Sequence, residues 1–427
     1  MEIKNNILHS NMRAQWIENL GRKIFFVYLT VYLTVQYMTK FSPYTLYTLV
    51  MIPGLLVAMM IAIKNRHQNK YSVPLDVLIF FLAVLLFTIS ALMINGTESS
   101  MIDIRRYFVS FSAYFFVRYT VGSLNKKIIL SIFSIYLIAS GILSLLQIYG
   151  GERFYLSFYL ADKVNCGAGY CGFANFSNIS GVLILWPLSV IIAMISTAEL
   201  KSGSIRMVHW FAIVLGTIGL YFTFSRAGWL GLFVALMITL ATVIVLKKPF
   251  YTILRAAAVV IVIFVCASFI PTPADSHREV KLRVIDYSSY TRIVTARVAL
   301  HDVIRKRPIW GVGVGKFPDY YQRFHTNLSE MAKKQVDPRE RINVHNSYLE
   351  YIVEVGTLPS VVMFIFIACI IINAARGSIS NPAFPFIIGL IAVSVWMFFH
   401  DFFKDRLFWI ALAMVAVFSE RYRKMSL

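Results

Sequence analysis

The chain alternates long apolar runs with short polar turns over most of its length. The apolar runs are roughly 16 to 22 residues long, about the length that a helix needs to cross the hydrocarbon core of a bilayer. The pattern therefore predicts twelve membrane-spanning helices. They are expected at about residues 23–38, 44–63, 75–95, 106–122, 128–149, 179–198, 207–224, 227–246, 251–270, 356–375, 383–399 and 405–419.

Composition excludes a soluble multidomain protein. Of the 427 residues, 58% are hydrophobic and only 15% are charged, whereas about a quarter of the residues of a soluble domain carry a charge. We expect an all-α polytopic membrane protein with a single membrane domain over residues 1–427. The polar N-terminus runs into the first span without a recognisable cleavage site, so that span is expected to stay as an anchor.

The basic residues of the short loops predict the orientation of the chain. With both termini in the cytoplasm, cationic residues fall on the cytoplasmic side, as the positive-inside rule requires. Contact with anionic headgroups accounts for much of the net charge of +20. Binding to nucleic acid is disfavoured because the cations are scattered over many loops. They are Lys64, Arg66, Lys70, Lys126, Lys127, Lys201, Arg206, Lys247, Lys248, Arg376, Arg421, Arg423 and Lys424.

Two long segments fall on the periplasmic side in this orientation. The smaller covers residues 150–178, and the larger covers residues 271–355 between the ninth and tenth spans. The larger is too long for a passive connector and should contain amphipathic helices and the active site. Between Pro271 and Val344 it holds fourteen basic and eight acidic residues. The excess indicates an anionic ligand, although a solvated amphipathic segment would show the same charge.

Three arginines are candidates for binding that anion. Arg226 lies in TFSRAGWLG between two spans that almost no loop separates, and Arg292 and Arg297 lie on a predicted amphipathic helix. A guanidinium suits phosphate because its planar fork donates two parallel hydrogen bonds and does not deprotonate. The alternative for Arg226 is that it reaches out to lipid phosphate. Arg292 and Arg297 are five residues apart and need not share a helical face.

His345 is the main candidate for proton chemistry. It lies in VHNSYLEYIVEVGTLP, residues 344–359, where a polar loop meets an apolar span. An imidazole at that border can exchange a proton near neutral pH. Packing is the alternative, since His345, Leu349 and Ile352 would share one face of a helix. Glu350 and Glu354 fall on another stripe and are hydrogen-bonding partners or proton acceptors.

Other polar features leave alternatives open. Lys404 and Arg406, with His400 and Asp401 in the last outer turn, are phosphate contacts or interfacial anchors. Cys166 and Cys171 share the smaller outer loop and could form a disulfide. The glycine run at residues 311–315 favours a tight turn over a dinucleotide site, which would need a βαβ unit. No spacing of histidines and cysteines indicates a metal.

Four motifs together resemble the O-antigen ligase and polymerase superfamily, and its ligase branch most. His345-Asn346 followed by nine residues and Gly356 resembles the signature of that superfamily. RPIWGVGVGKF at residues 307–317, TFSRAG at 223–228 and GFANFSN at 172–178 resemble three further segments, in the same order. The resemblance covers roughly residues 165 to 360, and the first five spans only in general layout.

The resemblance implies a GT-C-like glycosyltransferase that uses no metal and no other cofactor. Its donor would be a glycan on undecaprenyl diphosphate at the periplasmic face of the inner membrane. A sugar hydroxyl of lipid A–core would be the acceptor, in lipopolysaccharide biosynthesis. By the same resemblance, His345 would be the general base, and Arg226 and Arg292 would hold the diphosphate. Asn346 would orient the acceptor or His345.

Arg297, Lys404 and Arg406 are the further substrate-binding candidates. Direct displacement predicts inversion at the anomeric carbon. A polymerase of O-antigen or exopolysaccharide, or a protein O-oligosaccharyltransferase, would use the same donor and differ in acceptor. A twelve-span transporter is a third alternative, although transporters usually show internal repeats and polar residues at mid-membrane.

Overall fold

The computed structural model describes an all-helical chain. The described residues are 2–35, 43–68, 75–121, 126–150, 154, 170, 172–174, 177–197, 203–247, 250–269, 287–325, 343–376 and 383–426, and they contain no β-strand. The first part consists of α1 (Glu2–Val35), α2 (Pro43–Gln68), α3 (Leu75–Thr88), η2 (Ile89–Ile94), η3 (Gly96–Glu98), α4 (Met101–Thr120) and α5 (Lys126–Gly150).

The second part continues with helices on both sides of the large outer loop. Before it come α7 (Ser177–Ser196), α8 (Gly203–Phe222), α9 (Arg226–Val245) and α10 (Tyr251–Ser268). The loop contributes α11 (Tyr287–Val298), η6 (Ala299–Ile304), α12 (Phe317–His325) and α14 (Ser347–Val355). After it come α15 (Thr357–Arg376), α16 (Phe384–Met397) and α17 (Arg406–Ser426).

Each of the twelve expected spans overlaps a helix. The largest differences are at the two ends of the chain, where α1 begins well before its expected span and α17 continues beyond its own. Six helical segments of the described chain are long and apolar enough to cross a membrane: residues 75–94, 126–150, 177–196, 226–245, 251–268 and 357–376. Three shorter apolar segments lie at residues 50–63, 206–222 and 384–397. The chain is thus consistent with a polytopic membrane protein. The count of twelve spans stays a prediction.

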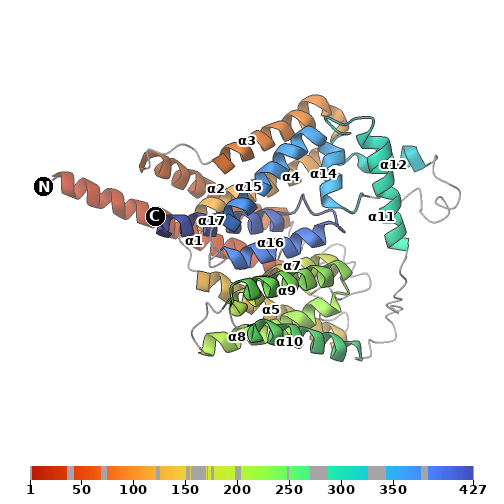
Figure 1. Ribbon diagram of the computed structural model, residues 1–427. Coiled ribbons are helices and arrows are strands. Elements are labelled where there is room, and N and C mark those ends of the chain that lie inside the picture. The colour runs from red at the N-terminus through yellow and green to blue at the C-terminus, as the bar shows by residue number, and fades with distance from the viewer. Residues whose placement is uncertain are drawn as a thin grey trace.

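The helices pack in two groups joined through α16 (Figure 1). In one group α1 to α4 pack with α15 and α17, and in the other α5 packs with α7 to α10. Helix α16 contacts α7 and α9 on one side and α15 and α17 on the other. Helix α7 is buried all round, as expected for a helix that is apolar on every face. Trp186, Trp396 and Trp409 fill the core of these central helices.

Part of the large outer loop folds into a small unit with its own core. Residues from α11, η6, α12 and α14 meet in an apolar cluster that is separate from the main core. The buried members of this cluster are Val294, Val298, Ala299, Val303, Val312, Phe317, Tyr321, Val344 and Val353. Helices α11, α12 and α14 lie in the segment where amphipathic helices were expected. Figure 1 shows α11 and α12 at the end of the molecule away from the two chain termini.

Close contact between α5 and α8 depends on a glycine. A Cβ atom added at Gly141 would overlap the backbone carbonyl of Leu215. A backbone carbonyl cannot rotate away as the end of a flexible side chain can, so a larger residue must push the two helices apart. The pair α5 and α8 is therefore held together at the distance that glycine permits.

We expect Gly141→Ala to lower the free energy of unfolding by about 1–3 kcal/mol, because overpacking forces backbone shifts. Thermal unfolding of the purified protein in detergent would measure the change. Ile142→Ala is the matched control, since the Ile142 side chain is exposed on the same helix. Equal stability of the two variants would contradict the close contact.

Candidate functional site

The start of α9 carries Arg226 directly after a strained turn. Phe224 has a φ of 51°, in the left-handed region that non-glycine residues rarely adopt. Ser225 then caps the helix, and its hydroxyl accepts a hydrogen bond from the Gly228 amide at 3.3 Å. The Trp396 indole donates to the same hydroxyl at 3.3 Å. Arg226 is exposed, and its helix start is tied to the end of α16 through Trp396.

Helix α11, which carries Arg292, contacts the segment before α14, which carries His345. The Thr295 hydroxyl lies 3.1 Å from the Arg292 carbonyl and 3.3 Å from the Val344 carbonyl. The peptide that leads into His345 is thereby held against the helix that carries Arg292. Arg297, on the same helix, has an exposed side chain.

His345 itself precedes α14 and is not part of it. Its φ is 52°, so its backbone is in the left-handed region. Asn346 follows as the cap of α14, and its side-chain oxygen accepts from the amides of Tyr348 and Leu349 at 3.1 and 3.0 Å. The alternative that His345 shares a helical face with Leu349 is therefore wrong, because the cap stands between them. Strained residues of this kind gather at functional sites.

His400 is a second histidine in this region of the protein. The Ser347 hydroxyl donates to the His400 carbonyl at 2.6 Å and accepts from the Phe402 amide at 2.7 Å. The His400 ring stacks on Trp396, with 4.0 Å between ring centroids and 20° between planes. Burial first, and then the neighbouring Arg292 and His345, lower the pKa of His400 to about 3. The structure thus joins Arg292, His345 and a neutral His400 in one region.

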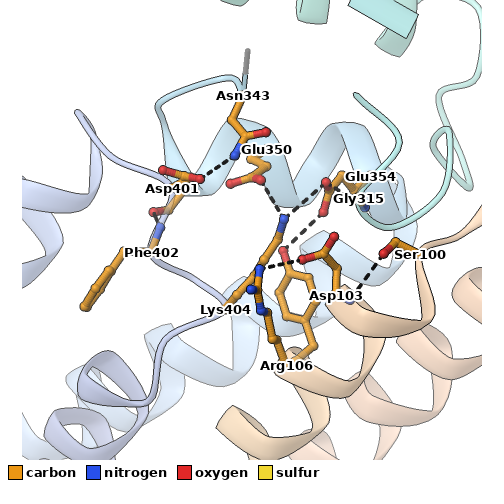
Figure 2. A network of polar contacts seen from close by, with 12 residues as sticks. Ser100, Asp103, Arg106, Gly315, Asn343, Glu350, Glu354, Asp401, Phe402 and Lys404 are labelled. Carbon is orange, nitrogen blue, oxygen red and sulfur yellow. Dashed lines mark hydrogen bonds and ion pairs between the residues drawn. The ribbon is translucent and has the colours of Figure 1, made fainter. Parts of the chain in front are cut away.

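Lys404 forms a buried ion pair with two glutamates (Figure 2). Its ammonium lies 2.8 Å from Glu350 Oε1 and 3.4 Å from Glu354 Oε1, and 5.8 Å from the centroid of the Tyr107 ring. Both glutamates are almost completely buried. The phosphate contact expected of Lys404 stays a prediction, and its ammonium group already has two glutamate partners on α14.

Glu354 extends this cluster to the glycine run. Its Oε1 also accepts from the Gly315 amide at 2.8 Å, while the Val312 and Gly313 amides donate to the carbonyls of Val353 and Glu354 at 3.0 Å. Gly311, Gly313 and Gly315 all have positive φ values, and a Cβ at Gly311 would meet the Val353 carbonyl at 2.5 Å. The glycines therefore form the expected tight turn, because only glycine allows this backbone and this close approach.

One lysine cannot balance two buried carboxylates. Burial raises the pKa of Glu350 to about 8, although Lys404 opposes the rise, and burial also raises the pKa of Glu354. For Lys404, burial lowers the pKa, but Glu350 and Glu354 outweigh it and raise the pKa above its usual value. Among the described residues, Glu350 Oε2 has no hydrogen-bond partner. We infer that Lys404 stays charged and that Glu350 takes up the shared proton.

The remaining sequence candidates have different positions. Arg406 is the first residue of α17 and is 7% exposed. The Asn343 side-chain amide donates to Asp401 at 2.6 Å, which joins the segment before His345 to the last outer turn. Cys166 and Cys171 lie outside the described residues. Sequence reasoning gave no part to Trp396, Ser347 or Ser225, because an isolated tryptophan or serine beside an apolar run carries no motif.

Lys404→Met should lower the free energy of unfolding by about 3–5 kcal/mol, because it leaves the buried carboxyl groups of Glu350 and Glu354 without their cation. Thermal unfolding would detect the loss. Replacing Glu350 and Glu354 by glutamine in the same chain should restore most of it. Lys316→Met is the control, since Lys316 forms only a partly exposed pair with Asp319. A Lys404→Met protein as stable as the control would show that the cluster adds nothing.

Glu350→Gln should stabilise the protein relative to wild type by an amount that grows as the pH rises from 6 to 8. The folded-state pKa of Glu350 lies above its unfolded value, so stability is present at low pH and is lost as the pH rises through that range. Melting temperatures at several pH values would measure the difference. His400, whose pKa is lowered in the folded state, changes stability with pH in the opposite direction. Its contribution is the same in both proteins and therefore cancels in the difference between them.

Glu98→Gln supplies the control for that comparison, because Glu98 forms an exposed pair with Arg307. This variant should follow the wild-type curve at every pH. A constant offset between Glu350→Gln and wild type would mean that Glu350 does not take up the proton.

Comparison with known proteins adds a family to this geometry. No curated protein matches the chain. Residues 211–365 match the family model described as O-antigen ligase. That region includes Arg226, Arg292, His345 and Asn346, and it ends before His400, Lys404 and Arg406. The match supports the O-antigen ligase superfamily, whose members are glycosyltransferase-like ligases and polymerases.

Proposed function

We propose that this protein is an O-antigen ligase of the inner membrane. It transfers a glycan from undecaprenyl diphosphate to a sugar hydroxyl of lipid A–core at the periplasmic face, without a metal, and it inverts the anomeric configuration. The fold is GT-C-like, with twelve spans and both termini in the cytoplasm. The position of α11 and α12 away from the two termini supports this orientation.

The contact between the helix of Arg292 and the peptide that leads into His345 is the observation that supports the proposal. The two residues are 53 positions apart in the chain, yet Thr295 holds the peptide before His345 against the helix of Arg292. Glycosyl transfer from a diphosphate needs a proton acceptor and a cation in one place. For Arg226, the support is that its neighbour Ser225 accepts a hydrogen bond from Trp396, on which His400 stacks.

The proposed reaction is a direct displacement. The oxygen of the acceptor hydroxyl forms a bond to the anomeric carbon while the bond from that carbon to the diphosphate oxygen breaks. The proton of the hydroxyl passes to the imidazole of His345. The electron pair of the broken bond leaves on undecaprenyl diphosphate, and the guanidinium groups of Arg226 and Arg292 stabilise this charge.

Asn346 has a positioning role in this mechanism. Its side-chain oxygen caps α14 and so fixes the backbone turn on which His345 stands. Preorganisation of this kind reduces the reorganisation needed to reach the transition state. Arg297 and Arg406 make further contacts to substrate phosphates. Lys404 acts chiefly by holding α14 to the last outer turn.

His345→Ala should reduce glycan transfer by about 10²–10⁴-fold, because the general base is lost. The purified protein would be reconstituted in liposomes with glycan-loaded undecaprenyl diphosphate, in a buffer without added metal. Two acceptors, lipid A–core and a second lipid-linked repeat unit, would be offered side by side. His301→Ala is the control, since His301 is an exposed histidine of the same outer loop.

The products of that assay decide between the functions. Transfer to lipid A–core, lost in His345→Ala, identifies a ligase, whereas extension of the repeat unit identifies a polymerase with the same chemistry. A retained anomeric configuration would contradict the displacement mechanism. Transfer to neither acceptor would overturn the proposal, and vesicle uptake of a radiolabelled glycan lipid would then test for a transporter.

A further inference from the structure

His400 is held in place by contacts that leave its ring nitrogens unused. The ring lies on the Trp396 indole, and the backbone carbonyl accepts from Ser347. Among the described residues, neither ring nitrogen of His400 has a hydrogen-bond partner. Trp396 covers one face of the imidazole, the backbone is fixed, and the residue is partly exposed.

His400 lies near two residues that take part in the proposed reaction. Arg292 and His345 are both close enough to act electrostatically on the ring. The last outer turn is also fixed from two sides, since Ser347 bonds to residues 400 and 402 and Asn343 bonds to Asp401. His400 therefore stands at a defined place beside the residues proposed to carry the diphosphate and the proton.

Structural duties alone do not explain a histidine at this position. Stacking on Trp396 needs an aromatic ring, which phenylalanine would supply, and the contact with Ser347 uses only the backbone. A neutral imidazole offers one N–H donor and one nitrogen acceptor. A phosphate oxygen only accepts and is served by arginine, whereas a sugar hydroxyl both donates and accepts.

We propose that His400 is a substrate-binding residue that hydrogen-bonds a hydroxyl of the reacting sugar, between Arg292 and His345. The inference rests on the proposed function and adds to it a sugar-recognition group beyond the region of the family match. The Trp396 stack presents the polar edge of His400, and the neighbouring Arg292 guanidinium binds the anionic part of the donor.

The test compares binding of two lipids to the full-length protein in nanodiscs. The probes are undecaprenyl diphosphate and the same lipid loaded with the glycan isolated from the cells that make this protein. His400→Phe keeps the ring that stacks on Trp396, and His400→Gln restores a donor and an acceptor. His301→Phe is the matched control, and Arg292→Met reports on the diphosphate.

His400→Phe should weaken binding of the loaded lipid by about 3- to 10-fold, as expected for one neutral hydrogen bond. It should leave binding of undecaprenyl diphosphate unchanged, and His400→Gln should recover most of the affinity for the loaded lipid. If the hydroxyl belongs to the acceptor instead, the KM for the acceptor rises by a similar factor while donor binding stays the same.

Three results would overturn the inference. One is unchanged donor binding together with an unchanged acceptor KM in His400→Phe. The second is an equal loss with both lipids, which would assign His400 to the diphosphate. The third is a His400→Gln protein that behaves like His400→Phe. Failure of the wild-type protein to bind either lipid would contradict the proposed function itself, and Arg292→Met separates these cases because it should weaken both lipids equally.

Discussion

A buried ammonium group needs a carboxylate partner, and this requirement organises the outer end of the protein. Lys404 meets it with Glu350 and Glu354 of α14, and Glu354 also holds the glycine run through Gly315. The same ammonium lies over Tyr107 of α4. Three parts of the chain that are distant in sequence are thus fixed to one another by one charge, because an unpaired charge in that place would be far costlier than the paired one.

The ion-pair cluster around Lys404 fixes the helix that follows His345 in the candidate site. Helix α14 is held by the cluster at residues 350 and 354, and its first residue is held by contacts with the last outer turn. The strained turn at His345 lies directly before the cap of this helix. A histidine with this backbone conformation keeps it only where its surroundings fix the chain on both sides. Phe224, before the cap of α9, repeats the arrangement at the other motif.

Much of the helical architecture was predictable, because the length and composition of each apolar run indicate a helix without reference to the rest of the chain. A run of about 20 apolar residues has few choices other than a helix, so each expected span overlaps one. The glycine run was also readable, since three glycines at alternate positions indicate a backbone that other residues cannot adopt. The motifs around Arg226, Arg292 and His345 indicated the parts of the chain that we propose carry the chemistry. None of these patterns states which segments meet.

The sequence by itself determined the helices, the tight turn and the residue types available for chemistry, because these depend on neighbours within a few positions. Only the tertiary structure decided how the charges pair and which rings meet. The sequence suggested Lys404 as a phosphate contact, yet its partners lie 54 and 50 residues away. His400 carried no motif, and it acquired a position beside Arg292 and His345 through stacking on Trp396. Such contacts follow from burial and from the chain path, which no local pattern encodes.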